Sequence, residues 1–163
     1  MFRNNVIALL LHFVLIVLST IYLIAFVSIS PFIGIYIINP FIRGVLVLLW
    51  IGAYFLIGTK LTTTRRKFDF SGGLVIALFG LILWVFGFYK TGMTFGTIPE
   101  ELRYHYIPLN VYLNPILQIC FLLNIEFNQV IRLIANFIPS ILIGFGLKYK
   151  RLRTSRRKYK ATS

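Results

Sequence analysis

Acidic residues are scarce in this sequence. Of its 163 residues, 4 are Asp or Glu, and charged residues of both signs make up 13% of the chain. Soluble domains carry roughly 25% charged residues, so this composition argues against an ordinary soluble domain. It also leaves few ways for two carboxylates to share general acid and base roles. Glu100 and Glu101 are the only close pair, and Glu126 lies apart from them.

Cysteine and the familiar catalytic motifs are also missing. Cys120 is the single cysteine, which excludes an intrachain disulfide and a cysteine-rich metal site. A lone thiol in an apolar stretch most often packs as a small hydrophobic side chain. The chain has no GxSxG, HExxH, P-loop or CxxC motif. We therefore predict no catalytic residues, no cofactor and no bound metal.

Long apolar runs dominate what remains. Hydrophobic residues make up 58% of the sequence, and the mean hydropathy is +0.85. Four runs can cross a hydrocarbon core of ~30 Å as helices, at about 1.5 Å per residue. They cover residues 6–30, 41–59, 72–89 and 130–147. We expect a single membrane domain over residues 1–147 and a basic tail over residues 148–163. The first run is longer than a signal-peptide core of about 7–15 residues, so we expect it to be retained.

The distribution of positive charge predicts how these helices are oriented. The net charge is +13, and 13 of the 17 basic residues lie at Arg3, in the loop at 60–67 or in the tail. Such segments stay on the cytoplasmic side of a membrane. They should attract anionic lipid, and nucleic acid is not expected as a partner. We predict a multi-pass protein of the cell membrane with both termini in the cytoplasm. Because no organelle address is present, we expect a bacterial membrane.

The same argument fixes the number of spans. If the loop and the tail share one side, the chain crosses the membrane an even number of times between them. Runs 72–89 and 130–147 are two crossings, so the apolar segment at 111–127 does not span. Polar residues and Pro115 interrupt that segment, as in a helix that lies in the interface or re-enters the bilayer. The predicted fold is all-α, with four transmembrane helices and a short interfacial or re-entrant outer-face helix between the third and the fourth.

Polar residues recur along one face of the fourth run. This polar stripe consists of Gln129, Arg132, Asn136 and Ser140. Pro139 cannot donate a hydrogen bond to the carbonyl of Ala135, so the helix should break beside the stripe. Such a stripe either bonds to neighbouring helices or lines a route for a ligand or ion. We favour packing against protein over a ligand route.

The third run carries a seam of mostly small residues. Its members follow alternating steps of four and three, so they share one helical face. They are Gly73, Ala77, Gly80, Trp84 and Gly87. Small residues on one face let a second helix approach closely, within the chain or in a dimer. We interpret this seam as a packing surface without chemistry.

Two histidines are weaker candidates for function. His12 lies alone in the first run, where a hydrogen-bonded packing role is more common than a ligand role. His105 could share a helical face with Glu101, next to Glu100. Zinc sites use three or four protein ligands and no second histidine is near, so this outer-loop cluster is a poor metal site.

Three functional hypotheses remain. The first is a non-enzymatic accessory or interaction subunit that contacts a membrane-protein partner, or itself, through its helices. The second is a small homodimeric transporter or channel that uses the polar stripe. The third is an enzyme that acts on a lipid or envelope substrate through Glu100, Glu101 and His105.

Overall fold

The computed structural model describes the backbone of residues 2–37, 39–62, 66–96 and 98–162, and over these ranges it is helical with no strands. The α-helices are α1 (Phe2–Ile37), α2 (Pro40–Lys60), α3 (Leu74–Lys90), α4 (Ile107–Tyr112), α5 (Asn114–Leu122), α6 (Gln129–Ala135) and α7 (Ile138–Thr162). Two 3-10 helices, η1 (Arg66–Gly73) and η2 (Glu100–Tyr106), precede α3 and α4. The prediction of an all-α fold is confirmed.

Four helical stretches are long and apolar enough to cross a membrane. They are Phe2–Ala25, Pro40–Lys60, Phe68–Lys90 and Gln129–Ser155. This confirms the expectation of four candidate spans. Large apolar side chains such as Leu10, Leu48 and Ile82 are at least 60% exposed on these helices. A surface of this kind is compatible with helices that contact lipid.

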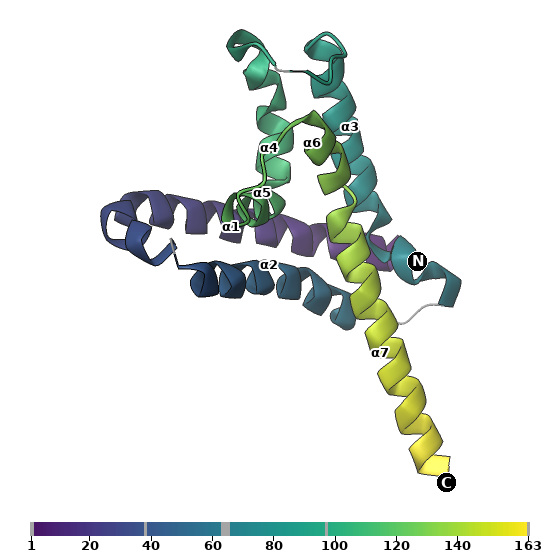
Figure 1. Cartoon of the computed structure of the whole chain (residues 1–163). Helices are drawn as coiled ribbons and strands as arrows, with labels where there is room; N and C mark the ends of the chain where they lie inside the picture. The colour runs from purple at the N-terminus through teal and green to yellow at the C-terminus, as the bar shows by residue number, and fades with distance from the viewer. Residues whose placement is uncertain (1, 38, 63–65, 97, 163) are drawn as a thin grey trace.

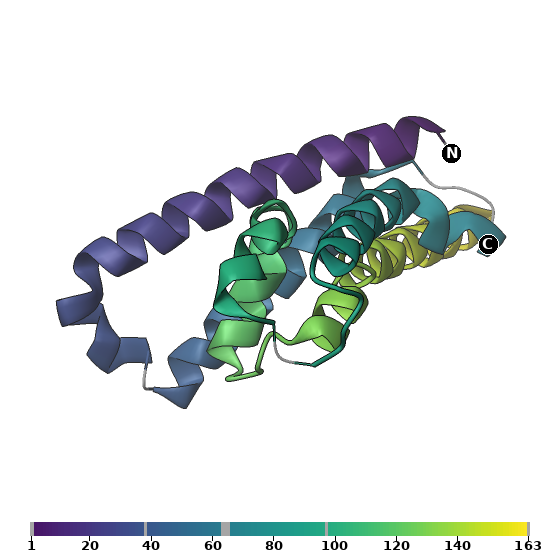
Figure 2. The ribbon, with the colours of Figure 1, turned by 90° about the horizontal axis from the view of Figure 1, so that it is seen from above.

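The helices form two groups that cross at a steep angle. α1 and α2 run side by side as an antiparallel hairpin, and α3 and α7 run across that hairpin (Figures 1 and 2). α4 and α5 lie between the two groups, where α4 packs on α3 and α5 packs on α1 and α2. The short helices therefore fill the angle between the two groups.

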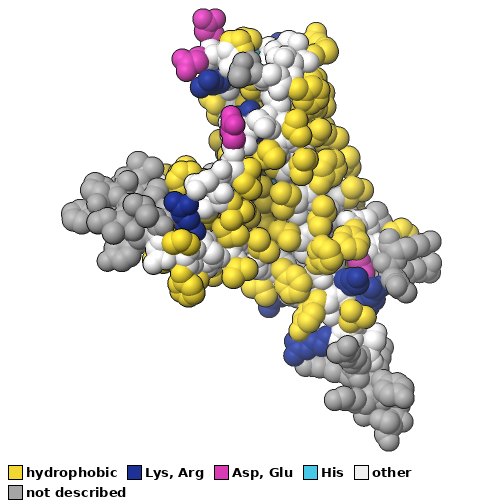
Figure 3. All heavy atoms as spheres, in the orientation of Figure 1, with side chains coloured by type: hydrophobic (Ala, Val, Ile, Leu, Met, Phe, Trp, Pro, Cys, Tyr) yellow, Lys and Arg dark blue, Asp and Glu magenta, His cyan; other side chains and the backbone are white. Residues whose placement is uncertain are grey.

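Hydrogen bonds join three segments at one end of the molecule: the N-terminus, the loop after α2 and the middle of α7. Asn4 Nδ2 donates to the backbone oxygen of Thr62 at 2.8 Å, and Thr62 Oγ1 donates to Asn4 Oδ1 at 2.7 Å. Lys150 Nζ donates to the backbone oxygen of Leu61 at 2.6 Å. We call this the basic end, because Arg3, Lys60 and the start of the charged part of α7 meet here. Figure 3 shows several Lys and Arg side chains low on the molecule, with others at the left and near the top, and most acidic side chains near the top.

A buried ion pair also joins η1 to α7 at the basic end. Arg151 Nη2 lies 2.7 Å from Asp69 Oδ2, and the Asp69 side chain is 2% exposed. The adjacent Phe70 packs against Gly144, where an added Cβ would collide with its ring. These contacts position the start of α3 against α7.

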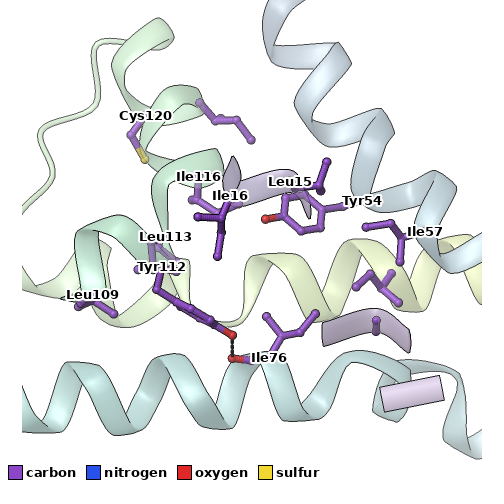
Figure 4. Close-up of a cluster of buried hydrophobic side chains, with 14 of the residues drawn as sticks. Leu15, Ile16, Tyr54, Ile57, Ile76, Leu109, Tyr112, Leu113, Ile116 and Cys120 are labelled. Carbon is purple, nitrogen blue, oxygen red and sulfur yellow. Dashed lines mark hydrogen bonds between the residues drawn. The ribbon is translucent and has the colours of Figure 1, made fainter. Parts of the chain in front are cut away.

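The segment at 107–122 forms the centre of the core. Leu109, Leu113 and Ile116 are completely buried, and Figure 4 shows them packed with side chains of α1, α2 and α3. Pro108 and Pro115 stand in the first turns of α4 and α5, where proline is tolerated. We predicted one helix over residues 111–127. The structure instead has two short helices, α4 and α5, and the second of them ends at Leu122. The chain then turns away from the helix axis at Asn124, which has a φ of 54°.

The fourth predicted span is also two helices. α6 ends at Ala135 and α7 begins at Ile138, one residue before Pro139. Proline removes a helical hydrogen bond and clashes with the preceding turn, which explains the break. Beyond Leu147, α7 continues without interruption into the basic tail.

Candidate functional site

The polar stripe of α6 and α7 faces other parts of the protein. Gln129, Asn136 and Ser140 are 1%, 0% and 7% exposed. Asn136 Nδ2 donates to the backbone oxygen of Arg132 at 2.8 Å, and Ser140 Oγ donates to that of Phe70 at 3.3 Å. Asn136 and Ser140 thus turn inward and form hydrogen bonds to the backbone within the protein.

The C-terminal half of the stripe, Asn136 and Ser140, packs directly against the small-residue seam of α3. A Cβ on Gly80 would collide with Asn136 Oδ1, and a Cβ on Gly73 would lie 3.0 Å from the Cα of Ser140. Gly87, further along α3, packs against the ring of Tyr106. Ala77 and Trp84 are also buried, at 2% and 7% exposure. All five residues of the seam are therefore used inside the chain, and the stripe is closed at Asn136 and Ser140.

The N-terminal half of the stripe, Gln129 and Arg132, lines a cavity of about 470 Å³. We call it the arginine pocket. Its lining residues are Phe95, Gly96, Ile98, Arg103, Glu126, Phe127, Asn128, Gln129 and Arg132. They come from the segment after α3, from η2, from the connection between α5 and α6, and from α6 itself.

Local sequence explains how these segments reach the pocket. Gly92 has a φ of 82° and Met93 a φ of 56°, so the chain reverses direction after α3. Phe95 then packs on Phe88 at a centroid distance of 4.9 Å, and Phe88 stacks on Trp84 at 4.7 Å. Phe95 lines the pocket, and its contact with Phe88 joins it to α3.

The other wall is set by the start of α6. The side chain of Asn128 accepts a hydrogen bond from the backbone N–H of Ile131 at 3.0 Å, which caps the helix. Trp84 Nε1 donates to the backbone oxygen of Gln129 at 3.3 Å and ties α6 to α3. Gln129 and Arg132, one turn apart, consequently both line the pocket.

Arg132 is held between two aromatic rings. Its guanidinium carbon lies 4.9 Å from the ring centroid of Tyr106 and 5.2 Å from that of Phe127. Such cation–π contacts position the charge while its N–H groups stay free to donate. Arg132 Nε is buried and has no hydrogen-bond partner among the described residues.

The side chain of Gln129 is also buried without hydrogen-bond partners in the part of the chain that the structure describes, since neither Nε2 nor Oε1 finds one there. A buried polar group without a partner costs about 1–3 kcal/mol. The Gln129 amide and the neighbouring Arg132 Nε therefore carry three N–H donors and one acceptor oxygen, all unpaired within the described residues, on two residues that line the pocket.

The outer-loop candidates do not assemble into a site. Glu100 pairs with Arg103 at 3.4 Å on the surface, with 87% of the Glu100 side chain exposed. Glu101 is exposed, and His105 contacts the ring of Phe86 at 6.4 Å. No group of three His, Cys, Asp or Glu side chains that could hold a metal occurs among the described residues. Arg103 is the residue of this segment that reaches the pocket.

His12 lies in a separate buried cluster at the centre of the molecule. Its Nδ1 is 2.9 Å from the hydroxyl of Tyr54, and its ring contacts the ring of Tyr112 edge-on at 4.6 Å. Tyr112 donates to the backbone oxygen of Ile76 at 2.8 Å (Figure 4). Burial raises the pKa of the Tyr112 hydroxyl, so this tyrosine is neutral at physiological pH. The cluster joins α1, α2, α3 and α4.

Cys120 is also part of the core. Its side chain is 6% exposed, and burial raises the pKa of the thiol. A protonated, buried thiol is a poor nucleophile, so we assign no reactivity to it.

Several residues that build the arginine pocket were not predicted from the sequence. Tyr106 and Phe127 hold Arg132, and Phe95 forms the opposite wall. A run of aromatic residues close to turn-forming glycines was the available signal, but it does not specify a pocket. No protein-family model, curated protein or solved structure matches the chain.

Proposed function

We propose that this protein is a non-enzymatic, multi-pass membrane protein, an accessory or interaction subunit that binds an amphipathic oxyanion in the arginine pocket. The observation that carries the proposal is that two residues with buried polar atoms unpartnered in the described chain, Gln129 and Arg132, both line one cavity. The ligand class is a phosphate or carboxylate attached to an apolar group.

The chemistry of the lining supports this ligand class. An arginine and an amide N–H donate hydrogen bonds to oxygen, and charge-assisted hydrogen bonds to an oxyanion are stronger than neutral ones. Arg103 adds a second positive charge to the lining, against the single carboxylate of Glu126. Phe95, Ile98 and Phe127 supply apolar surface for the rest of the ligand.

The proposed orientation places the basic end in the cytoplasm and the arginine pocket on the opposite side of the cell membrane. Arg3, Lys60 and the start of the tail meet at the basic end, which supports a common side for them. The ligand would then enter from outside or from the outer leaflet.

A partner would contact a surface other than the α3 seam. The seam residues are buried against α7, Tyr106 and Tyr112, so they are not free for a second chain. The exposed faces of α1 and α2 are apolar surfaces available to lipid, to a second copy or to a membrane-protein partner. Mass measurement after purification in mild detergent tests this part of the proposal, because an interaction subunit should retain a stoichiometric partner or a second copy.

Transport along the polar stripe would require a rearrangement. Gly73 and Gly80 press against Ser140 and Asn136, so α3 and α7 would have to separate before an ion could pass. We therefore favour ligand binding over transport as the function of the polar stripe.

Binding can be measured with Trp84 as a reporter, because Trp84 contacts Gln129 directly. In a Trp50→Phe variant, Trp84 is the remaining tryptophan. We would titrate octyl phosphate against this protein in nanodiscs and follow the fluorescence. Octanol tests the apolar chain alone, and inorganic phosphate tests the anion alone.

The expected result is a saturable change with octyl phosphate that exceeds the response to either control compound. Arg132→Met and Gln129→Leu should each weaken binding about tenfold, as expected for loss of a hydrogen bond to a charged group. Lys90→Gln is the matched control, because it removes a charge near the end of α3 but does not line the pocket. Equal affinity in Arg132→Met and Lys90→Gln would contradict the proposal.

A further inference from the structure

A second cavity lies at the basic end, where α2 and α7 come together. Its volume is about 540 Å³. The lining residues are Phe55, Leu56, Thr59 and Lys60 of α2, with Tyr149, Lys150, Arg153 and Thr154 of α7. We call this cavity the basic groove. It is separate from the arginine pocket and shares no residue with it.

The polar side of the groove is cationic. Lys60, Lys150 and Arg153 contribute three positive charges, and the groove lining contains no carboxylate. Lys150 donates one hydrogen bond to the backbone oxygen of Leu61 at 2.6 Å, which fixes its ammonium beside the end of α2. An ammonium has three N–H donors, so two remain for a ligand. The nearby carboxylate of Asp69 is in an ion pair with Arg151, which does not line the groove.

The other side of the groove is apolar and aromatic. The rings of Phe55 and Tyr149 lie 5.6 Å apart across the two helices. Leu56 is 59% exposed, and it continues along α2 into an exposed apolar face with Leu49 and Val45, at 63% and 43% exposure. These three residues are spaced by seven and four positions, so they lie on one side of the helix.

The groove also lies where the apolar parts of both helices end. Lys60 is the last residue of α2, and charged residues begin in α7 directly after Leu147. Cations at this level of a spanning helix meet the headgroup region, whereas Leu56 and Leu49 remain at the level of the acyl chains. The groove thus matches an anionic lipid in both charge and depth.

We infer that the basic groove binds the phosphate headgroup of an anionic phospholipid, whose acyl chains lie on the exposed face of α2. This is a specific site shared by two helices, and it goes beyond the general attraction of a basic tail for a charged membrane. It does not depend on the arginine pocket. Each helix contributes at least one cation, so the lipid would bridge α2 and α7.

The experiment uses native mass spectrometry of the full chain, delipidated in detergent and titrated with phosphatidylglycerol or phosphatidylcholine. We expect a first phosphatidylglycerol that binds at least tenfold more tightly than phosphatidylcholine, consistent with charge-assisted hydrogen bonds to the headgroup. Arg153→Gln should weaken that first binding step about tenfold. Lys148→Gln is the matched control, because Lys148 is an exposed cation of α7 that does not line the groove, and it should change binding less than about twofold.

Lys60→Gln tests the contribution of α2 and should weaken the first binding step as Arg153→Gln does. Equal effects of Arg153→Gln and Lys148→Gln would show general electrostatic attraction and overturn the proposed site. Loss of binding in Arg153→Gln alone, with Lys60→Gln unaffected, would place the lipid on the tail and also overturn it. Inorganic phosphate that displaces phosphatidylglycerol at comparable concentration would show that the groove takes a soluble phosphate instead of a lipid.

Discussion

Gly58 and Gly146 touch backbone to backbone where α2 crosses α7. A Cβ on Gly58 would lie 2.9 Å from the Cα of Gly146 and would collide with the backbone oxygen of Ile143. A Cβ on Gly146 would in turn collide with the backbone oxygen of Phe55. Backbone atoms cannot move aside as a flexible side chain can, so this crossing requires two glycines. The same crossing sets the spacing of the basic groove.

We predict that Gly58→Ala destabilises the protein. The added methyl group must push α2 and α7 apart, and overpacking of this kind costs about 1–3 kcal/mol. Gly52→Ala is the control on the same helix, because nothing lies within 4 Å of a Cβ at Gly52. Thermal unfolding in detergent should show a lower midpoint for Gly58→Ala than for Gly52→Ala. Equal midpoints for the two variants would show that the crossing is not close in solution.

The hydrogen bond between His12 and Tyr54 gives a second prediction. Both side chains are completely buried, and His12 Nε2 already lacks a hydrogen-bond partner within the described chain. Tyr54→Phe would leave Nδ1 unpaired as well, at a cost of about 1–3 kcal/mol. Unfolding by SDS should therefore begin at lower detergent concentration. Tyr89→Phe, at a 64% exposed tyrosine of α3, should leave the unfolding curve unchanged.

The ion pair between Asp69 and Arg151 gives a third prediction. Asp69→Asn would leave the Arg151 guanidinium, whose side chain is 20% exposed, without its carboxylate partner. Removal of one member of a buried pair costs about 3–5 kcal/mol, and partial exposure of Arg151 places the expected cost at or below the lower end. The double variant Asp69→Asn/Arg151→Met should recover part of the stability, as measured by thermal unfolding. A double variant less stable than Asp69→Asn would show that the two side chains do not stabilise the protein as a coupled pair.

The helices could be predicted from the sequence because their signal is local. A long apolar run satisfies its own backbone hydrogen bonds as a helix, so α2 and α3 appear close to the ranges expected for them. The break before α7 follows from Pro139 for the same local reason. α1 is longer than the predicted run at 6–30. It continues through residues 31–37, a segment that includes Pro31.

The candidate site could not be predicted because it depends on contacts between distant segments. Arg132 and Gln129 stood out as polar residues in an apolar run, yet their meaning depends on Tyr106, Phe127 and the turn after α3. Nothing in the local sequence brings those segments together. Gly58 and Gly146 were missed for the same reason, because two glycines 88 positions apart on different helices give no periodic pattern.

Labelling with an impermeant maleimide tests the proposed orientation. A Cys120→Ala background removes the only native thiol, which should itself react slowly, since burial raises its pKa and reduces the thiolate fraction at any pH near 7. Thr94→Cys, in the exposed turn beside the arginine pocket, should then be labelled in intact cells. Thr154→Cys, at the exposed rim of the basic groove, should be labelled only after the cells are opened. Unfolded protein in SDS provides the control, because both thiols should react fully there. Labelling of Thr154→Cys in intact cells would reverse the proposed orientation, and it would place the phospholipid of the basic groove in the outer leaflet.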